Sequence, residues 1–434
     1  MLSLIQRLET KGSFVQNVAS TFLVQGFSLF LSIAAAAIVA RWLGPEGKGI
    51  LAMALLLPGM MRLFLSGGIE VANVYFAGSR RLDLPTLTAN SATFAVLATV
   101  LAIGVAGILA ATGWLGTLVP GVPLQLVLLA MVGIPLGLFT GYLSSILVGL
   151  QRITTANVTT LSQGVTRLIL TIALVIGCRW GLVGALLASL GAMTVNTLAV
   201  AALLRREGGV FLPRWNLPVM RTTLSFGLRG YVGNVLQFFN YRLDMFLVNY
   251  FLGPTGVGIY TVSVSMAELL WYLPNAVGFV IFPRAAATKP EVMNAFTPRV
   301  FRITLGLTAL GALGLALLGK PLTILIYSSA FANAFIPMLV LLPGVVLLGS
   351  AKVLTNEIAG RGYPHYNSAA SGLALVLTLV LDLLLIPRLG VLGASLASSV
   401  AYTAIFFISI VFYLIVSRKT TAVTLPPLPD AKEN

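Results

Sequence analysis

The sequence predicts an all-α integral membrane protein with twelve transmembrane helices, arranged as two six-helix repeats around a central cleft. Three observations support this fold class. Of the 434 residues, 58% are hydrophobic and only 9% are charged, with a mean hydropathy of +0.98, whereas soluble domains have about 25% charged residues. Apolar runs long enough to cross a bilayer recur along the whole chain, and two sequence blocks recur at a constant offset.

The apolar runs match the length of membrane spans, since about 20 apolar residues cross a hydrocarbon core of about 30 Å. The second run is too long for one straight crossing, and Pro58 or the Gly67-Gly68 pair is expected to kink it. The first run has no small-residue cleavage site, so we expect a retained helix and not a signal peptide. The expected spans are 14–40, 47–78, 86–111, 122–148, 153–178, 181–204, 223–251, 256–282, 296–318, 334–358, 366–386 and 391–416.

The basic residues indicate the topology. The chain has a formal charge of +15, and cytoplasmic loops of membrane proteins are enriched in Lys and Arg. If the N-terminus is cytoplasmic, seventeen basic residues lie on the cytoplasmic side and five on the other side: Arg41, Lys48, Arg179, Lys320 and Arg388. We therefore expect a multi-pass protein with both termini cytoplasmic, and no nucleic-acid partner, because no basic domain stands clear of the membrane.

Two sequence blocks recur with an offset of 209 residues. LGPEGKGI at 43–50 returns as LGPTGVGI at 252–259, and RWGLVGALLAS at 179–189 returns as RLGVLGASLAS at 388–398. An even number of spans per repeat predicts two halves related by a pseudo-twofold axis along the membrane normal. In LGPxGxG, proline fixes φ and the glycines permit a tight turn between paired helices. The same offset aligns Arg152 with Arg361.

The repeat defines the expected domains. These are an N-terminal six-helix lobe (1–205), a cytoplasmic linker (206–221), a C-terminal six-helix lobe (222–417) and a disordered cytoplasmic tail (418–434), whose TTAVTLPPLPDAKEN sequence is polar and proline-rich.

Ionisable residues interrupt the apolar runs, and at membrane depth such groups usually face protein or water. Asn234, Gln237, Tyr241 and Asp244 fall on one face of the seventh span, and the repeat offset aligns Gln25 with Asn234. We therefore expect two symmetry-related helices to line the cleft. The ionisable residues within the runs are Arg62, Glu70, Arg167, Arg229, Arg242, Asp244, Glu268, Lys352, Glu357 and Asp382.

Structural roles are the alternative for these residues. Ser, Thr, Asn and Gln connect neighbouring membrane helices by hydrogen bonds. Charged side chains form buried ion pairs or extend to the membrane interface. Arg242 and Asp244 are two positions apart, so they do not face each other along one helix.

The chain resembles the Wzx-type polysaccharide flippases, which share a superfamily with multidrug and toxin extruders and lipid II flippases. The resemblance rests on the twelve-span repeat, ARWLGPEGKG at 40–49, GLQR at 149–152 and the charged middle loop. Twelve spans favour this branch over the lipid II branch, which typically has fourteen. The resemblance implies translocation of an undecaprenyl-pyrophosphate-linked oligosaccharide across the bacterial inner membrane, with membrane lipids, a polysaccharide polymerase and a chain-length regulator as partners.

Site roles follow from this resemblance together with side-chain chemistry. Guanidinium groups bind pyrophosphate, and amides and hydroxyls hydrogen-bond sugars, while a carboxylate at low dielectric is suited to coupling a proton or sodium ion. The pyrophosphate or sugar ligands we expect are Arg62, Arg167, Arg242 and Lys352. The expected sugar contacts are Gln25, Asn234, Gln237 and Tyr241, and the expected ion-coupling residues are Asp244, Glu268 and Glu70.

Three other functions compete with the flippase. A cation-extruding antiporter needs an acidic, aromatic cleft. A membrane glycan polymerase or glycosyltransferase needs paired carboxylates or a metal site. A major-facilitator transporter has a loop signature that SRRLDLP at 79–85 lacks. We expect no catalytic residues, no metal and no cofactor beyond a coupling ion: there is no P-loop, and Cys178 and His365 are single.

Overall fold

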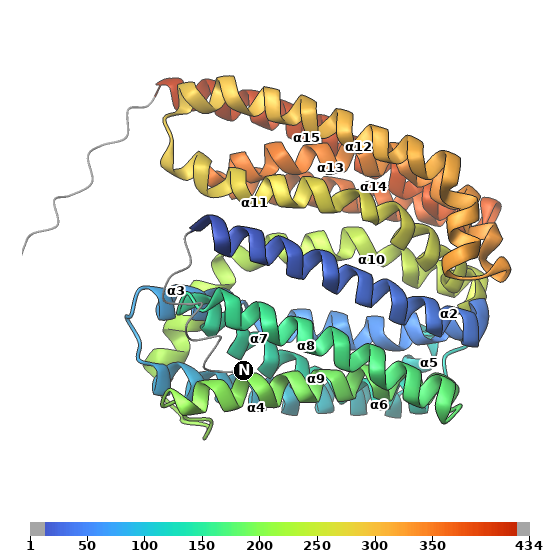
Figure 1. The fold of residues 1–434 in the computed structure, drawn as a ribbon, viewed down its shortest axis with the longest axis horizontal. Coiled ribbons are helices and arrows are strands. Elements are labelled where there is room, and N and C mark those ends of the chain that lie inside the picture. The colour runs from blue at the N-terminus through green and yellow to red at the C-terminus, as the bar shows by residue number, and fades with distance from the viewer. Residues whose placement is uncertain (1–13, 423–434) are drawn as a thin grey trace, which may run out of the picture. The chain divides into compact units, whose positions relative to one another are not determined.

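The structure of the protein is a computed structural model that describes residues 14–422, and all its regular elements in this range are helices (Figure 1). The first half contains α2 (Phe14–Ser66), α3 (Ile69–Gly78), α4 (Leu84–Ala111), α5 (Trp114–Leu118), α6 (Leu124–Met131), α7 (Gly133–Gly149), α8 (Ile153–Thr171), the π-helical turn η1 (Ile172–Gly177) and α9 (Gly181–Arg206). The second half contains α10 (Leu217–Glu268), the 3₁₀ turn η2 (Leu269–Trp271), α11 (Tyr272–Ala287), α12 (Pro290–Ile326), the 3₁₀ turn η3 (Ser329–Ala334), α13 (Phe335–Gly360), α14 (Pro364–Leu389) and α15 (Val391–Ala422).

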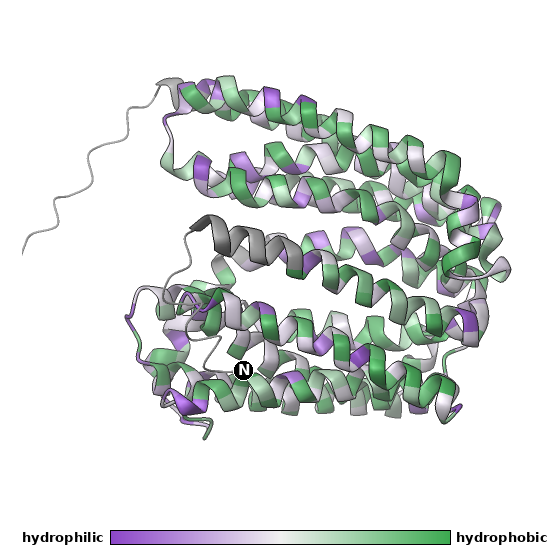
Figure 2. Cartoon of the chain, in the orientation of Figure 1, coloured by the Kyte–Doolittle hydropathy of each residue, from purple (hydrophilic) through white to green (hydrophobic). Residues whose placement is uncertain are grey.

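These helices supply the expected number of membrane spans. Ten helical segments of the described chain are long and apolar enough to cross a membrane. Two of them, Val24–Ser66 in α2 and Gly233–Ala287 from α10 to the end of α11, each contain one non-helical glycine that divides the segment into two spans, which gives twelve. Green hydrophobic positions predominate along these helices, and purple hydrophilic positions are frequent at helix ends and loops (Figure 2). The twelve spans predicted from hydropathy are therefore confirmed.

The repeated LGPxGxG sequence forms the same turn twice. Gly44 has φ 68° and ψ −175°, and Gly253 has φ 70° and ψ −175°. This region of backbone space is accessible essentially only to glycine. Pro45 and Pro254 follow directly and begin the next helical segment, where the missing N–H of proline leaves no hydrogen bond unmade. The predicted turn between paired spans is confirmed, and it needs only one non-helical residue.

The other glycines of the motif permit close backbone contact. A Cβ atom on Gly49 would overlap the carbonyl oxygen of Pro254, and a Cβ on Gly258 would overlap the carbonyl oxygen of Pro45. The two contacts are reciprocal, because Gly49 aligns with Gly258 and Pro45 with Pro254 in the repeat. The first glycine of the motif therefore makes the turn, and the last lets the two copies touch.

The overlong second span is interrupted where the sequence predicts. Gly67 (φ 55°) and Gly68 (φ 72°) separate α2 from α3, while Pro58 lies inside helical α2. Gly68 also packs directly on the backbone of Gly227 in α10. The glycine pair, and not the proline, therefore ends the helix here.

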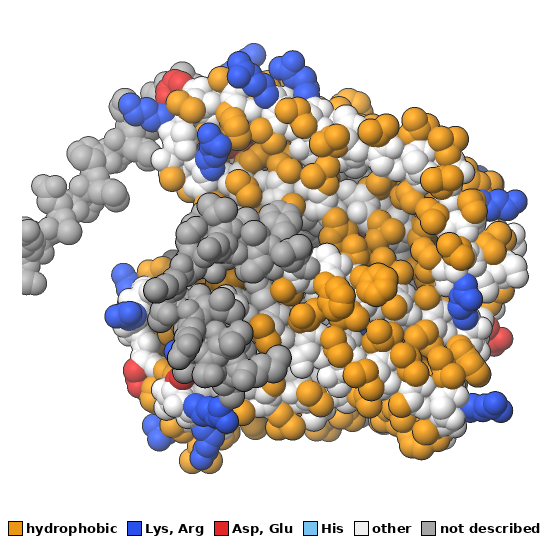
Figure 3. Space-filling model, viewed as in Figure 1, with side chains coloured by type: hydrophobic (Ala, Val, Ile, Leu, Met, Phe, Trp, Pro, Cys, Tyr) orange, Lys and Arg blue, Asp and Glu red, His pale blue; other side chains and the backbone are white. Residues whose placement is uncertain are grey.

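The chain divides into two compact units, each with its own core. Unit 1 contains residues 1–235, 245–262 and 322–333, and unit 2 contains 236–244, 263–321 and 334–434. Large apolar clusters in unit 1 join α3, α4, α7 and α9, with Tyr142, Leu143 and Ile146 fully buried. In unit 2, Ile281, Met293 and Val353 form one such cluster. Many other large apolar side chains are exposed, and on the face in Figure 3 they cover the sides of the helices, as a lipid-facing surface requires.

The expected domain boundaries stay a prediction, although the structure describes the segments next to them. Helix α9 ends at Arg206 and α10 begins at Leu217, so the middle linker is ten residues, 207–216. Helix α15 runs to Ala422, so the first residues of the expected C-terminal tail are helical. The rest of that tail, 423–434, lies outside the described residues, as do residues 1–13.

Candidate functional site

A polar and aromatic group in unit 2 surrounds the ammonium of Lys352. Its Nζ donates a hydrogen bond to Asn275 Oδ1 at 2.9 Å and lies 4.0 Å from the ring centroid of Trp271 and 5.9 Å from that of Tyr241. A cation over an aromatic face is attracted by the negative ring face. Helices α10, α11 and α13, together with turn η2, bring these four side chains together. We call Lys352, Asn275, Trp271 and Tyr241 the Lys352 group.

The aromatic side of the Lys352 group is held rigidly. Trp271 donates its indole N–H to the carbonyl of Val345 at 2.9 Å. Tyr241 packs against Trp271 with ring centroids 5.2 Å apart, and Tyr402 of α15 packs on both. Gln237 donates to the Tyr241 hydroxyl at 3.0 Å, one helical turn away. The shared helical face predicted for Gln237 and Tyr241 is therefore a direct contact.

Arg242 and Glu268 form an ion pair beside this group. The two terminal guanidinium nitrogens of Arg242 lie 3.0 and 3.3 Å from the two carboxylate oxygens of Glu268. Their side chains are 33% and 22% exposed. The sequence assigned Arg242 to substrate and Glu268 to ion coupling, but the structure uses each to neutralise the other. Neither is a free charge in this state.

Asp244 and Asp382 form a buried acidic pair in unit 2. Asp244 is 2% exposed and accepts a hydrogen bond from Ser398 at 3.2 Å. Asp382 of α14 is fully buried and interacts electrostatically with Asp244. Neither of its carboxylate oxygens has a hydrogen-bond partner among the described residues. One turn before each acid, Thr378 donates to Asn240, so oxygen-bearing side chains continue along both helices.

A second group of charged side chains, Arg62 and Glu70, lies in unit 1 against two glycines of α7. Arg62 donates to the carbonyl of Gly137 at 3.2 Å, and the carboxylate of Glu70 lies against Gly141, one turn further along α7. A side chain at either glycine would meet these groups. Both charges also interact with the buried hydroxyl of Tyr142. The two glycines thus make space beside α7 for Arg62, which is exposed, and for Glu70, which is partly buried.

Two cations lie close together elsewhere in unit 1. Lys48 of α2 interacts electrostatically with Arg167 of α8, and both residues are only partly exposed. Within residues 14–422, neither side chain forms an ion pair with a carboxylate. Like charges in such surroundings repel, so this pair is suited to an anionic ligand. The sequence predicted Arg167 as a ligand, but counted Lys48 only among the basic residues of the non-cytoplasmic side, at the start of the second expected span.

The predicted site residues therefore separate into groups. Those in unit 1 are Gln25, Arg62, Glu70, Arg167 and Asn234, and those in unit 2 are Gln237, Tyr241, Arg242, Asp244, Glu268 and Lys352. Gln25 and Asn234 are exposed. Sequence reasoning missed Trp271, Tyr402 and Lys48 as site residues. It placed Asn275 on the polar, cleft-lining face of the eighth span, and it counted Asp382 among the ionisable residues of the spans without a specific role. The described residues hold no group of three or more His, Cys, Asp or Glu that suits a metal ion.

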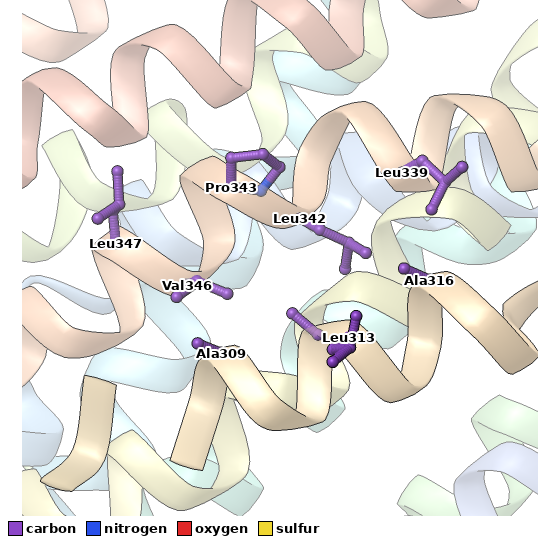
Figure 4. A pocket seen from close by; sticks show the side chains of 9 residues that line it. Ala309, Leu313, Ala316, Leu339, Leu342, Pro343, Val346 and Leu347 are labelled. Carbon is purple, nitrogen blue, oxygen red and sulfur yellow. The ribbon is translucent and has the colours of Figure 1, made fainter. Parts of the chain in front are cut away.

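An apolar groove of about 530 Å³ lies between α12 and α13 of unit 2 (Figure 4). Its width comes from small residues, since Ala309, Ala312 and Ala316 recur on one face of α12. Leu342, Val346 and other apolar side chains of α13 line the opposite wall. With no polar group to bind, the groove suits hydrocarbon only.

Comparison with known proteins identifies the family. The profile of a family described as "Polysaccharide biosynthesis protein" matches residues 14–289, more than half of the chain. The chain belongs to this family.

Curated relatives of this member of the polysaccharide biosynthesis protein family match only in part. A probable low-salt glycan biosynthesis flippase, Agl15, of Haloferax volcanii is 22% identical over 42% of this chain. An uncharacterized membrane protein of Methanocaldococcus jannaschii is 22% identical over 45% of the chain. Each match spans 39% of the relative's own length.

Solved structures match the polysaccharide biosynthesis family member over nearly its whole length. The lipid II flippase MurJ in an inward closed conformation has a TM-score of 0.73 at 14% identity, covering 93% of this chain and 90% of that one. An inward-facing multidrug resistance transporter of the MATE family has a TM-score of 0.70 at 16% identity, covering 91% and 95%. The predicted all-α, twelve-helix membrane fold with two repeats is confirmed. The relatives with a named activity are flippases and transporters, not enzymes.

Proposed function

We propose that this protein is a flippase that moves an undecaprenyl-pyrophosphate-linked oligosaccharide from the cytoplasmic to the outer leaflet of the bacterial inner membrane. Its chemical task is to carry a charged, hydroxyl-rich head group through hydrocarbon, where an unpaired polar group costs several kcal/mol. Family membership and the resemblance to a glycan flippase support this class of transport.

The observation that carries the proposal is the Lys352 group. Asn275 and Lys352 offer hydrogen bonds to the hydroxyls of a sugar, while the buried ring of Trp271 and the partly exposed ring of Tyr241 hold the Lys352 ammonium in place. An amide donor next to a cationic donor suits a neutral or anionic saccharide. A cation-extruding antiporter would need an unpaired carboxylate here, and the nearby Glu268 is already paired with Arg242.

Lys48 and Arg167 are the proposed ligands for the pyrophosphate. They are two like charges in a partly buried place, and no described carboxylate forms an ion pair with either. A guanidinium binds two phosphate oxygens at once, and an ammonium adds a compact point charge. Binding a pyrophosphate would offset the repulsion between these two cations, which supports the assignment.

Transport needs an energy source, and we propose a proton or a sodium ion bound by Asp244 and Asp382. Two carboxylates at close range inside a protein do not both stay ionised without a cation. Asp382 suits a bound cation, because both of its carboxylate oxygens are buried and no described residue donates a hydrogen bond to them. The ion would supply a positive charge beside Asp382, which forms no ion pair with a described residue, and its occupancy would couple to the packing of α10 against α14.

The test compares Lys352→Met with the matched control Lys320→Met, which removes an exposed lysine. Both are reconstituted in proteoliposomes with a fluorescent undecaprenyl-pyrophosphate oligosaccharide, and flipping is measured after membrane abundance is equalised. We expect about a tenfold lower rate for Lys352→Met, the loss of one charged hydrogen bond, and no change for Lys320→Met. Equal rates would remove the Lys352 group from the mechanism.

The same wild-type proteoliposomes separate the rival functions. Export of cationic drugs without movement of the lipid-linked sugar would make the protein an extruder. Formation of a longer glycan from the lipid-linked substrate would make it a polymerase or glycosyltransferase. For the flippase we expect neither, and a polysaccharide polymerase and a chain-length regulator would then act on its product.

A further inference from the structure

A groove of about 520 Å³ opens beside the end of α3 and the beginning of α10 in unit 1. Its polar lining consists of Arg81, Arg221, Thr222 and Ser225, and its apolar lining consists of Tyr75, Phe76 and Phe226. None of these residues belongs to the sites described above. The lining has two guanidinium groups and no carboxylate, so the groove is a local positive site.

The floor of the groove is a rigid aromatic stack. The rings of Tyr75 and Phe226 are parallel within 21° and have centroids 4.5 Å apart. Phe76 packs edge-on against Phe226 at 5.6 Å and is only 6% exposed, since it belongs to the apolar cluster of α3, α7 and α9. The stack therefore ties the end of α3 to the beginning of α10 and fixes the shape of the groove.

Three hydrogen-bond donors of the groove, on Arg81, Arg221 and Ser225, are free to bind a ligand. Neither Arg81 nor Arg221 forms an ion pair within residues 14–422, and the only described contact of the Arg81 guanidinium is the Tyr75 ring, 5.6 Å from its centroid. The hydroxyl of Ser225 has no hydrogen bond to a described residue, whereas Thr222 is committed to the carbonyl of Pro218. Two guanidinium groups and one hydroxyl can thus donate to the same ligand.

We propose that this groove binds the phosphate of an anionic membrane lipid from the cytoplasmic leaflet. Guanidinium pairs favour phosphate oxygens, and the side of the membrane follows from the expected topology, in which Arg81 and Arg221 are cytoplasmic. Its position at the ends of two spans, with a Tyr beside the arginines, matches the interface where lipid head groups lie. The aromatic floor contacts the glycerol and upper acyl carbons, which free phosphate lacks. The inference is independent of the proposed transport function.

The experiment measures lipid retention by the full-length protein in native mass spectrometry. The protein is incubated with an equimolar mixture of phosphatidylglycerol and phosphatidylcholine. We expect phosphatidylglycerol to be retained, and Arg81→Gln/Arg221→Gln to lower its affinity by about fivefold for each arginine removed. Arg205→Gln/Arg206→Gln is the control, because it removes the same charge from exposed sites on the same expected side, outside the groove. An equal loss in both double variants would mean diffuse surface attraction and would overturn the proposal.

Two further competition measurements identify which phosphate compound the groove binds. Inorganic phosphate at millimolar concentration is expected not to displace phosphatidylglycerol, and displacement would make the groove a soluble-anion site. Undecaprenyl pyrophosphate is expected not to bind preferentially, and preference for it would assign the groove to the transport substrate. If the double arginine variant does not fold, Ser225→Glu tests the same point at an exposed position, and undiminished phosphatidylglycerol retention there would contradict the proposal.

Discussion

Gly49 and Gly258 each lie against the carbonyl oxygen of the proline in the other copy of the repeated turn. Neither position has space for a Cβ atom, since one on Gly49 would overlap Pro254 and one on Gly258 would overlap Pro45. The reciprocal contact joins two segments that are 209 residues apart in sequence. It explains why the repeat retains small residues beyond the turn itself, and it makes both positions sensitive to a single methyl group.

Gly49→Ala and Gly258→Ala are therefore expected to destabilise the protein, by about 1–3 kcal/mol for overpacking against backbone. The matched control is Gly59→Ala in the same helix, where a Cβ would meet nothing within 4 Å. Alanine is the better helix former, so this control should be neutral or slightly stabilising. The measurement is the melting temperature in detergent, followed by size-exclusion chromatography. A Gly49→Ala protein as stable as Gly59→Ala would refute the contact.

Two aligned arginines give a second matched comparison. Arg361 pairs with Glu357, with side chains 3% and 0% exposed, and also donates to Asn294 at 2.7 Å. Arg152, its counterpart in the first repeat, pairs with Glu207, with side chains 34% and 24% exposed. Removing one partner of a buried pair costs about 3–5 kcal/mol, whereas an exposed pair contributes about 0–1 kcal/mol.

Glu357→Gln is thus expected to lower stability far more than Glu207→Gln. Reversible unfolding in SDS measures the free energy of both variants under the same conditions. Similar losses would mean that the pair of Arg361 is as well hydrated as the pair of Arg152. Arg361→Gln/Glu357→Gln, which leaves no unpaired charge, should recover part of the loss.

The Arg242–Glu268 pair is expected to show energetic coupling. Because its two contacts of 3.0 and 3.3 Å are both charge-assisted, a double-mutant cycle of Arg242→Gln and Glu268→Gln should give an interaction of about 0.5–3 kcal/mol. SDS unfolding of the two single variants and the double variant gives this value. Strict additivity would indicate that the two residues act separately, as their sequence-based roles assumed.

The buried acids predict a cation effect on stability. If Asp244 and Asp382 bind sodium, wild-type protein should melt a few degrees higher in sodium chloride than in choline chloride, because a ligand stabilises the state that binds it. Asp382→Asn should abolish the difference, and the exposed-acid control Glu291→Gln should retain it. If sodium does not change the melting temperature of the wild type, a proton remains as the coupling ion. If Asp382→Asn keeps the sodium effect, Asp244 and Asp382 are not the sodium site.

The sequence predicts the helices well and the site in part, for a physical reason. Spans and turns are local properties: hydrophobic length sets the spans, and glycine with proline sets the turns at Gly44 and Gly253. The contacts between charged side chains depend on how the helices pack, and sequence periodicity does not give that packing. Arg242 and Glu268 were therefore assigned different roles, although packing makes them partners.

Aromatic residues were missed for a related reason. Trp271 and Tyr402 lie within apolar runs, where an aromatic side chain that faces lipid and one that forms a binding surface have the same hydropathy. Only their contacts with Tyr241 and Lys352 distinguish them. Lys48 was used only to assign the non-cytoplasmic side, because it lies next to the repeated turn at the start of the second expected span. Its proximity to Arg167 depends on how α2 packs against α8.

The nearly identical torsions of Gly44 and Gly253 bear on how the chain arose. A repeat of this kind is expected from gene duplication, and the two copies differ at most of their aligned positions. At these two positions every replacement would bring a Cβ into forbidden backbone geometry. Stereochemistry therefore explains why both copies have glycine at this turn, although the side chains around it differ between the two copies.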